Sequence, residues 1–313
     1  MDVNWDDMRI FLSVARLESL SAAGRMLKLD PATVGRRIGR LEDGLSVNLF
    51  TKSPQGYVLS DAGQRFLAHA ERAEQAILLA REDLGGQGGP LSGQVRIGAP
   101  DGSANYLLPQ ICARIGADNP GLELQIVALP RVFNLSKREA DMAVALSPPD
   151  TGRLNVQKIT DYRLHLAASQ DYLEKHKQIK GIEDLVSHRI VGYIPDMIFD
   201  KELDYLAEAG AKQVNTASNS VSVQINLLRQ GAGVGVIHDF AMPFCPELQL
   251  VLPDHVSLKR SFYLIRHVND AKVARLNRVA DLIRRGIAKE VARLEAVLDS
   301  ACDARDPVIT TTS

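Results

Sequence analysis

The chain has 313 residues, more than one typical domain holds, so we expect two or three structural units. Its content of 45% hydrophobic and 24% charged residues is ordinary for a globular protein. The formal net charge is −1, which excludes a bulk polycation, so any nucleic-acid binding must come from a local basic patch.

Membrane and metal signals are absent from the sequence. No apolar run approaches the roughly 20 residues needed to cross a bilayer, and residues 1–7 lack the basic and apolar parts of a signal peptide. We therefore expect a cytoplasmic protein without a membrane partner. Cys112, Cys245 and Cys302 form no CxxC pair and have no histidine spacing that suggests zinc. We expect reduced cysteines, no metal and no cofactor.

The first sixty residues predict three helices. Met8, Phe11, Leu12 and Ala15 form a helical stripe, so a first helix is expected within residues 1–17. Residues 22–29 predict a short second helix, and residues 31 to about 43 a third. In the third helix the apolar residues recur at i, i+4, i+7 and i+11 on one narrow stripe. They are Val34, Ile38, Leu41 and Leu45.

The third helix carries clear end signals. Asp30 suits the N-cap, because its carboxylate can accept from first-turn amides. Pro31 suits the first helical position, where no N–H is required, and Gly44 could supply the stop. Gly35 and Gly39 lie on one flank, where they either allow close approach to a DNA backbone or are tolerated surface glycines.

Beside the apolar stripe the third helix is small, polar and basic: Ala32, Thr33, Arg36, Arg37 and Arg40 lie there, and Arg25, Lys28 and Lys52 add to the patch. A helix that is apolar on one side and arginine-rich on the other can pack inward and still face a polyanion. This is what a recognition helix in a DNA major groove requires. An ordinary two-helix hairpin with a solvated charged face is the simpler alternative.

A wing follows the three helices. Residues 49–50 and 57–59 predict two short strands, joined by a Pro/Gly turn at 51–56 that carries Lys52 and Gln55. Three helices and a wing make a winged helix-turn-helix, whose wing tip and arginines reach phosphates while the helix reaches base edges. Residues 1–60 are therefore predicted to be a DNA-binding domain.

At this point the sequence resembles the LysR-type transcriptional regulators. The resemblance is carried by Ser21-Ala22-Ala23, Leu27, Val34, Arg36, Ile38, Leu41-Glu42, Leu45, Val47, Leu49-Phe50 and the run from Leu59 to Gly63. Asp30-Pro31 and Gly35 depart from it, since relatives often have Ser-Gln and serine there. The predicted DNA-contacting residues are Ser21, Ala32, Thr33, Arg36, Arg37, Arg40, Lys52 and Gln55.

A long helix with a different pattern follows at residues 61–85. Ser60 can cap it, and its apolar positions alternate spacings of four and three, a heptad seam. These positions are Phe66, Ala70, Ala73, Ile77, Ala80 and Leu84. The helix could lie on its own domain. The resemblance implies instead a linker helix that pairs two subunits, giving a homodimer or homotetramer on a partly palindromic double-stranded promoter site.

Residues 86–93, rich in glycine, predict a flexible hinge. From residue 94 onward apolar strands alternate with helices, which indicates mostly parallel α/β sheets. The predicted strands are 95–98, 122–127, 142–146, 164–168, 190–193, 214–216, 234–237 and 262–265, and the helices 106–117, 135–140, 221–229 and 272–298. The tail at 301–313 is predicted to be disordered.

The resemblance extends over this region through Gly93 to Gly98, Leu107-Leu108-Pro109, Pro120, Glu139-Ala140-Asp141 and 231–236. It implies an effector-binding domain over 94–300 like a periplasmic binding protein, with two α/β lobes crossed by two strands. One lobe would comprise 94–163 and 266–300, the other 164–265. A small-molecule effector would bind in the cleft between them.

Two predicted helix N-termini qualify as ligand sites, because free amides point outward there. Ser103, Asn219 and Ser220 could donate to a carboxylate or phosphate, or they could be simple N-caps. Family analogy adds cleft loops at 129–131, at 147 and at 193–196. The predicted effector-binding residues are Asp101, Gly102, Ser103, Pro130, Ser147, Tyr193, Asn219 and Ser220. Asp101 would repel an anion, so the ligand is neutral or cationic, or Asp101 turns away.

Three classes of function are compatible with these patterns: a ligand-responsive regulator, a solute-binding protein and an enzyme. The missing signal peptide and the N-terminal DNA-reading unit count against the second. The glycine run at 231–235 precedes a strand, the reverse of a dinucleotide loop. His238 and Asp239 could pair, but no motif places a nucleophile beside them. Some LysR-type regulators sense oxidants through two cysteines, so a Cys112–Cys245 switch is a minor alternative. We expect a sequence-specific regulator and no enzyme.

Overall fold

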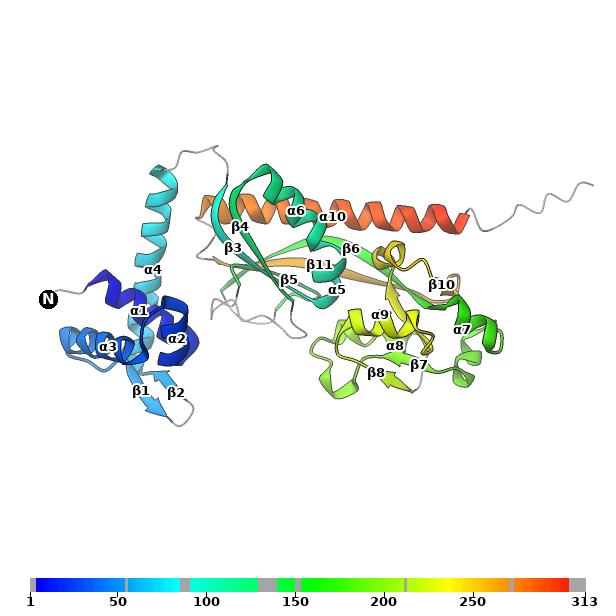
Figure 1. Cartoon of the computed structure of the whole chain (residues 1–313), viewed down its shortest axis with the longest axis horizontal. Helices are drawn as coiled ribbons and strands as arrows, with labels where there is room; N and C mark the ends of the chain where they lie inside the picture. The colour runs from blue at the N-terminus through cyan, green and yellow to red at the C-terminus, as the bar shows by residue number, and fades with distance from the viewer. Residues whose placement is uncertain are drawn as a thin grey trace, which may run out of the picture. The chain divides into compact units, whose positions relative to one another are not determined.

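The computed structural model describes residues 4–53, 56–84, 91–128, 140–149, 153–210, 213–268, 270 and 273–303. The chain divides into two compact units (Figure 1). The first comprises 1–89, 136–138 and 269–274, and the second 90–135, 139–268 and 275–313. Within the described ranges no helix is both long and apolar enough to cross a membrane.

The first unit has the predicted three helices and wing. Its elements are α1 (Trp5–Leu17), α2 (Leu20–Leu27), α3 (Pro31–Leu45), β1 (Phe50–Ser53), β2 (Gly56–Leu59) and α4 (Asp61–Leu84). The strands pair antiparallel from Phe50 opposite Leu59 to Ser53 opposite Gly56. The stripe of Val34, Ile38 and Leu41 is buried against α1 residues such as Phe11 in a single core. The sequence therefore set the inner face of α3 through its 3.6-residue periodicity.

The start of α3 is confirmed and its predicted end is wrong. Asp30 accepts a hydrogen bond from the Ala32 amide at 2.8 Å, and Pro31 is the first helical residue. The helix does not stop at Gly44. It ends at Leu45, after which Ser46 adopts a left-handed conformation with φ of 55°. Leu45 packs against the core, and this burial carries the helix past the glycine.

The turn between α2 and α3 requires a glycine. The Leu29 amide donates to the Gly24 carbonyl at 2.9 Å, and a Cβ at Gly24 would lie 2.7 Å from the Leu29 carbonyl oxygen. The two helices therefore turn closely upon each other.

Hydrogen bonds connect the wing to α3 and to the end of α1. The Glu42 carboxylate on α3 accepts from the amides of Leu49 at 2.6 Å and Phe50 at 3.0 Å. The Tyr57 amide donates to the Glu18 carbonyl at the end of α1, 3.0 Å away. The base of the wing is thus fixed relative to α3 by charge-assisted hydrogen bonds to the Glu42 carboxylate, in addition to packing.

The second unit is built on a nine-stranded sheet of order β4-β3-β5-β11-β6-β9-β7-β8, with β10 also paired to β6. The strands are β3 (Ser92–Ala99), β4 (Gly121–Ala128), β5 (Met142–Ala145), β6 (Leu154–Ser169), β7 (Ile190–Gly192), β8 (Thr216–Ala217), β9 (Val234–His238), β10 (Leu248–Val251) and β11 (Ser257–His267). The pairs β3/β4, β3/β5, β7/β8 and β7/β9 are parallel. Every pairing of β6 is antiparallel.

The two longest strands, β6 and β11, run through two lobes (Figure 1). In one lobe they continue the sheet of β3, β4 and β5, and in the other the sheet of β7, β8 and β9. Their register shifts between Phe262 and Tyr263, a bulge of the kind that re-aims side chains beside a site. The predicted lobe limits, 163/164 and 265/266, fall inside these continuous strands.

Helices cover the sheet of the second unit. They are α5 (Asp101–Tyr106), α6 (Leu108–Asp118), α7 (Gln170–Lys175), α8 (Tyr205–Glu208), α9 (Val221–Arg229) and α10 (Ala274–Asp303), with 3-10 turns at Ile182–Ser187, Pro195–Met197, Lys201–Leu203 and Asp239–Phe244. The last helix is tied to α6 by Arg114–Glu290 at 2.7 Å and to β6 by Arg163–Glu295 at 3.1 Å.

Several predicted limits in this unit are corrected. The helix predicted at 106–117 is α6, which begins two residues later at Leu108 because Pro109 favours a new helix start, and Tyr106 instead ends a separate short helix, α5. β3 begins at Ser92, inside the predicted hinge, and β6 begins ten residues before 164. α10 runs to Asp303, so the predicted tail begins too early. Most of the predicted helix at 135–140 and residues 304–313 of the predicted tail lie outside the described residues.

Candidate functional site

The first candidate surface is the exposed face of α3. Ala32 and Arg36 are exposed and Thr33 is half-buried, opposite the buried stripe. A Cβ at Gly39, one turn beyond Arg36, would meet no atom within 4 Å. Arg36 forms no ion pair with any described residue. This face therefore presents small side chains and a cation to solvent from the first two turns of the helix.

Arg37 and Arg40, which were predicted to contact DNA, both lie against a carboxylate of their own unit. Arg40 donates to both oxygens of Asp7 on α1, at 2.7 and 2.5 Å, and Arg37 lies 3.4 Å from the same carboxylate. The Asp7 side chain is only 3% exposed. Both arginines compensate a buried carboxylate, and sequence reasoning missed this because Asp7 is thirty residues away on another helix.

The other residues predicted to contact DNA are Ser21, Lys52 and Gln55, and of these the structure describes only the side chain of Ser21. Ser21 is exposed on α2, as are the neighbouring cations Arg25 and Lys28. Lys52 belongs to β1, but its side chain is not among those described, and Gln55 lies outside the described residues.

The first residues of the heptad seam of α4 pack inside their own unit, and later ones are more exposed. Phe66 stacks edge-on against Phe11 with ring centres 5.0 Å apart, and Ala70 is fully buried in the core of its own unit. Ala70 is thus covered where α4 packs on α1, while Phe66 is only half-buried, and the role of both in pairing subunits stays a prediction. Ala73 is half-buried and Ile77 is 42% exposed. The side chains of Ala80 and Leu84 are outside the described set.

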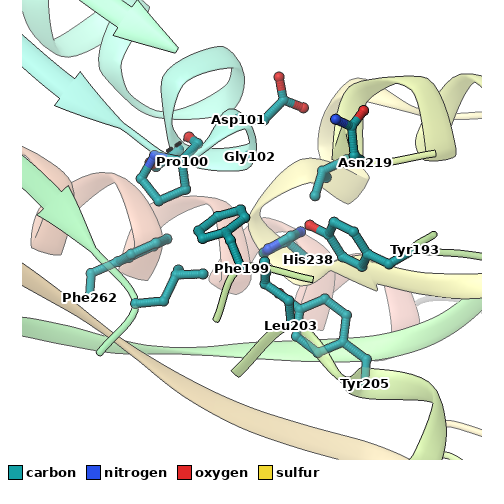
Figure 2. A pocket seen from close by; sticks show the side chains of 13 residues that line it. Pro100, Asp101, Gly102, Tyr193, Phe199, Leu203, Tyr205, Asn219, His238 and Phe262 are labelled. Atoms are coloured by element: carbon teal, nitrogen blue, oxygen red, sulfur yellow. Dashed lines mark hydrogen bonds between the residues drawn. The ribbon is translucent and has the colours of Figure 1, made fainter. Parts of the chain in front are cut away.

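The second candidate site is a cavity between the lobes of the second unit (Figure 2). It is lined by Pro100, Asp101, Gly102, Ser103, Leu146, Tyr193, Phe199, Leu203, Tyr205, Asn219, Val221, His238 and Phe262. The cavity volume is about 10 Å³, room for roughly one water molecule. Aromatic rings fill the space, so a larger ligand must move side chains or part the lobes.

Asp101 does not point into this cavity. Its Oδ2 accepts from the Ser222 amide at 2.7 Å and from Ser220 Oγ at 3.0 Å, and its Oδ1 accepts from Asn105 at 3.1 Å. Ser220 and Ser222 belong to the start of α9 in the opposite lobe, so the carboxylate joins the two lobes. In Figure 2 it lies at the rim, directed away from the aromatic rings.

Only some of the other residues predicted to bind the effector line the cavity. Ser103 is 1% exposed and donates to the Pro100 carbonyl at 3.0 Å. Ser220 also caps α9, accepting from the Val223 amide at 3.3 Å. Ser147 donates to Asp200 across the lobes at 2.6 Å. Asp101, Gly102, Ser103, Tyr193 and Asn219 line the cavity, Ser147 and Ser220 do not, and Pro130 lies outside the described residues.

Sequence reasoning missed most of the aromatic lining, and His238 above all. Its ring stacks on Tyr162 at 5.5 Å, and a Cβ at Gly102 would lie 3.3 Å from it. Burial lowers the pKa of His238 to about 4, so the ring is neutral at pH 7. Its Nδ1 is buried and has no hydrogen-bond partner among the described residues. The run Val234–His238 gives no signal of this, because all five residues of β9 are buried and the cavity forms only where the two lobes meet.

His238 and Asp239, which could have formed a pair, do not: His238 ends β9 and lines the cavity, while Asp239 begins the 3-10 turn that follows and has other partners. Asp239 instead lies 2.7 Å from Nδ1 of His165 on β6, and Arg163 lies 3.4 Å from its other oxygen. Among the described residues, no hydroxyl or thiol is hydrogen-bonded to His165. This arrangement resembles a structural ion-pair network more than an acid–base site.

Comparison with known proteins decides the family. A model of the bacterial regulatory helix-turn-helix protein, lysR family, matches residues 5–64, and a LysR substrate binding domain model matches 88–288. The chain belongs to the LysR-type transcriptional regulators. It therefore combines a helix-turn-helix DNA-binding domain with an effector-binding domain.

Individual proteins similar to this LysR-type regulator are also transcriptional regulators by name. The transcriptional regulator CrgA of Neisseria meningitidis is 24% identical over 77% of this chain and 81% of its own. DgdR of Burkholderia cepacia is 28% identical over 76% and 79% of the two chains. The solved structure of CrgA matches with a TM-score of 0.54 at 21% identity, covering 94% and 99%. A full-length OxyR variant from Pseudomonas aeruginosa matches with a TM-score of 0.66 at 18% identity, covering 92% and 95%.

Cys112 and Cys245 of this regulator lie in environments that keep them protonated. Burial raises the pKa of the Cys112 thiol, and that of the Cys245 thiol, to about 11. At pH 7 only about one thiol in ten thousand would be the reactive thiolate. These environments disfavour the alternative of a Cys112–Cys245 redox switch.

The pairing of Arg40 with Asp7 leads to a stability prediction. In Arg40→Ala the buried Asp7 carboxylate loses its two shortest charge-assisted hydrogen bonds, so we expect the melting temperature of the first unit to fall by several degrees. Trp5, the only tryptophan, lies on α1 of this unit and reports its unfolding by fluorescence. An unchanged melting temperature would show that Arg37 alone satisfies Asp7.

Proposed function

We propose that this LysR-type regulator reads a partly palindromic promoter site through α3 and changes its DNA contacts when a small molecule occupies the cavity of the second unit. The observation that carries the DNA-reading part is the exposed face of α3, with Ala32, Thr33 and Arg36 opposite a buried stripe. Recognition helices contact base edges from their N-terminal turns. Ser21 on α2 and the wing residues Lys52 and Gln55 would contact phosphates.

We propose that the subunits pair through the C-terminal half of α4, giving a homodimer or a homotetramer. Phe66 and Ala70 pack on the core of their own unit, so Ala73, Ile77, Ala80 and Leu84 carry most of this role. Ile77 is 42% exposed, so its side chain is free to pack against a second subunit. A second subunit would cover it and place two α3 helices on one face of the DNA.

In this proposal the protein acts in the cytoplasm, where the promoter DNA lies, and it catalyses no reaction. The buried His165–Asp239 pair supports this, because it is tied to Arg163 and contacts no described nucleophile. An enzyme would predict turnover of a small molecule by the purified protein.

The function is tested by DNase footprinting of the full-length protein on DNA flanking its own gene, with excess nonspecific competitor. We expect a protected site with approximate two-fold symmetry, because two subunits present equivalent helices. Absence of any protected site with folded protein, across a genomic library of fragments, would overturn the regulator reading in favour of a binding protein.

Arg36 supplies a residue-level test. Because its guanidinium has no partner in the described chain, Arg36→Ala should leave the Trp5-monitored melting temperature unchanged while weakening DNA binding. If Arg36 contacts a phosphate, the slope of log affinity against log salt should fall by about one. Fluorescence anisotropy with the footprinted site measures both quantities. Unchanged affinity would remove Arg36 from the interface, and Arg40→Ala is the matched comparison.

A further inference from the structure

Residues about one turn apart hold α4 against its own unit. Phe66 packs edge-on against Phe11 with ring centres 5.0 Å apart, and Ala70 is fully buried in the core. Glu74 then accepts two hydrogen bonds from Arg16, in the last turn of α1, at 3.2 and 2.5 Å. Residues spaced by four lie on one face of a helix. The unit therefore contacts α4 along one face, and the Arg16–Glu74 pair is the end of that contact.

The Arg16–Glu74 pair is shielded from solvent and constrained in geometry. The two side chains are 16% and 21% exposed, so salt screens their attraction less than that of a surface pair. Two nitrogens of the guanidinium meet the two oxygens of the carboxylate. A bidentate pair of this kind fixes the orientation of its partners as well as their distance. The pair therefore sets an angle between α1 and α4.

α4 departs from the rest of its unit directly after Glu74. Among the residues that the structure describes, no residue of α4 beyond Glu74 hydrogen-bonds to another element. The next side chains described, those of Ala76 and Ile77, are exposed. The helix continues to Leu84 (Figure 1), about 15 Å further at the helical rise of 1.5 Å per residue. Arg16–Glu74 is thus the last described contact that sets the direction of this segment.

That direction determines where the two α3 helices of a dimer lie. This step rests on the proposed pairing of subunits through the C-terminal half of α4. With that half held by the partner, a change of angle at Glu74 swings the whole DNA-binding unit. Such a unit is roughly 20 Å across, so a swing of about 10° moves α3 by about 3 Å, close to the rise of about 3.4 Å per base pair.

We propose that the Arg16–Glu74 pair sets the separation of half-sites that this regulator accepts. Both residues are positioning residues, because they act on DNA only through the direction of α4. Without the pair α4 can pivot on Phe66 and Ala70, so the two α3 helices can reach half-sites at more than one separation. The exposed face of α3 does not change, so binding to a single half-site is unaffected.

The test compares selectivity for spacing with affinity for one half-site. Fluorescence anisotropy of the full-length protein uses the footprinted site, the same site with one base pair inserted between its halves, and a duplex with one half-site. In the wild type the insertion should weaken binding at least about tenfold, because α3 loses its register with the base edges. In Glu74→Ala this penalty should fall to about twofold, with half-site affinity within about twofold of the wild type.

Matched variants separate the pair from a general effect of charge. Arg16→Ala should lose the same selectivity, and the double variant should lose no more, because either substitution removes the same pair. Glu71→Ala is the control. Glu71 is half-buried on the preceding turn of α4 and forms no ion pair with a described residue, so its removal takes away one negative charge and should keep the wild-type penalty. Glu74→Gln replaces the alanine variant if that does not fold.

Three results would overturn the proposal: a wild-type insertion penalty in Glu74→Ala, an equal loss of affinity for the half-site probe, or a similar fall of the penalty in Glu71→Ala. A wild type that binds both spacings equally also overturns it. A wild type that protects no site would overturn the DNA-binding function and this proposal with it. A protected site with unchanged selectivity in the variants overturns this proposal alone, so the two failures are distinguishable.

Discussion

Replacing Gly63 by alanine is expected to unfold or severely destabilise the DNA-binding unit. A Cβ at this position would lie 2.0 Å from the carbonyl oxygen of Leu49 and 3.0 Å from its carbonyl carbon. Both are backbone atoms of the segment that leads into the wing, and the wing is held by hydrogen bonds to Glu42 on α3. Because the backbone cannot rotate away as a side chain would, we expect a cost of about 3 kcal/mol or more.

The measurement is urea unfolding of the full-length protein followed by Trp5 fluorescence, together with the affinity for the footprinted DNA. Gly39→Ala is the control, since a Cβ there meets nothing within 4 Å. That substitution should stabilise α3 by up to about 1 kcal/mol through helix propensity. If Gly39→Ala also weakens DNA binding, α3 approaches the DNA backbone closely at this flank. Equal unfolding midpoints for Gly63→Ala and wild type would contradict the first prediction.

The second unit should lose stability as the pH falls from about 6.5 toward 4. His238 has an ordinary pKa of 6.5 when the chain unfolds and a pKa of about 4 in the folded protein, because burial disfavours its charged form. Between pH 6.5 and 4 the unfolded chain binds a proton at His238 that the folded chain does not bind. The free energy of unfolding therefore decreases as the pH is lowered. The full difference corresponds to about 3 kcal/mol, reached near pH 4 and constant below it.

His238→Gln should remove most of this pH dependence, as measured by denaturant unfolding of the full-length protein followed by tyrosine circular dichroism. The groups around His238 are Asp101, which favours protonation, and the uncharged phenols of Tyr162 and Tyr205. A residual slope is expected from His188, whose pKa is lowered by burial and by His176. A variant that retains the full wild-type slope would assign the effect to groups other than His238.

Local patterns in the sequence determined the architecture of this protein. The stripe of Val34, Ile38 and Leu41, the Asp30 cap and the Ser60 cap, whose Oγ accepts from the Gly63 amide at 3.0 Å, predicted helices that the structure contains. These signals act within one or two helical turns, so they are readable without tertiary information. The alternating strands and helices after residue 94 likewise predicted an α/β unit, and the family resemblance supplied its two lobes.

Tertiary structure decided which of the candidate residues are available for function. Arg37 and Arg40 lie on the arginine-rich face of α3, but the buried carboxylate of Asp7 occupies them. Phe66 and Ala70 obey the heptad seam, but they pack on the core of their own unit. Asp101 was expected either to select a neutral or cationic ligand or to turn away, and it is held by α9. In each case the partner comes from a segment distant in sequence, and only packing brings such segments together, so no local periodicity could reveal it.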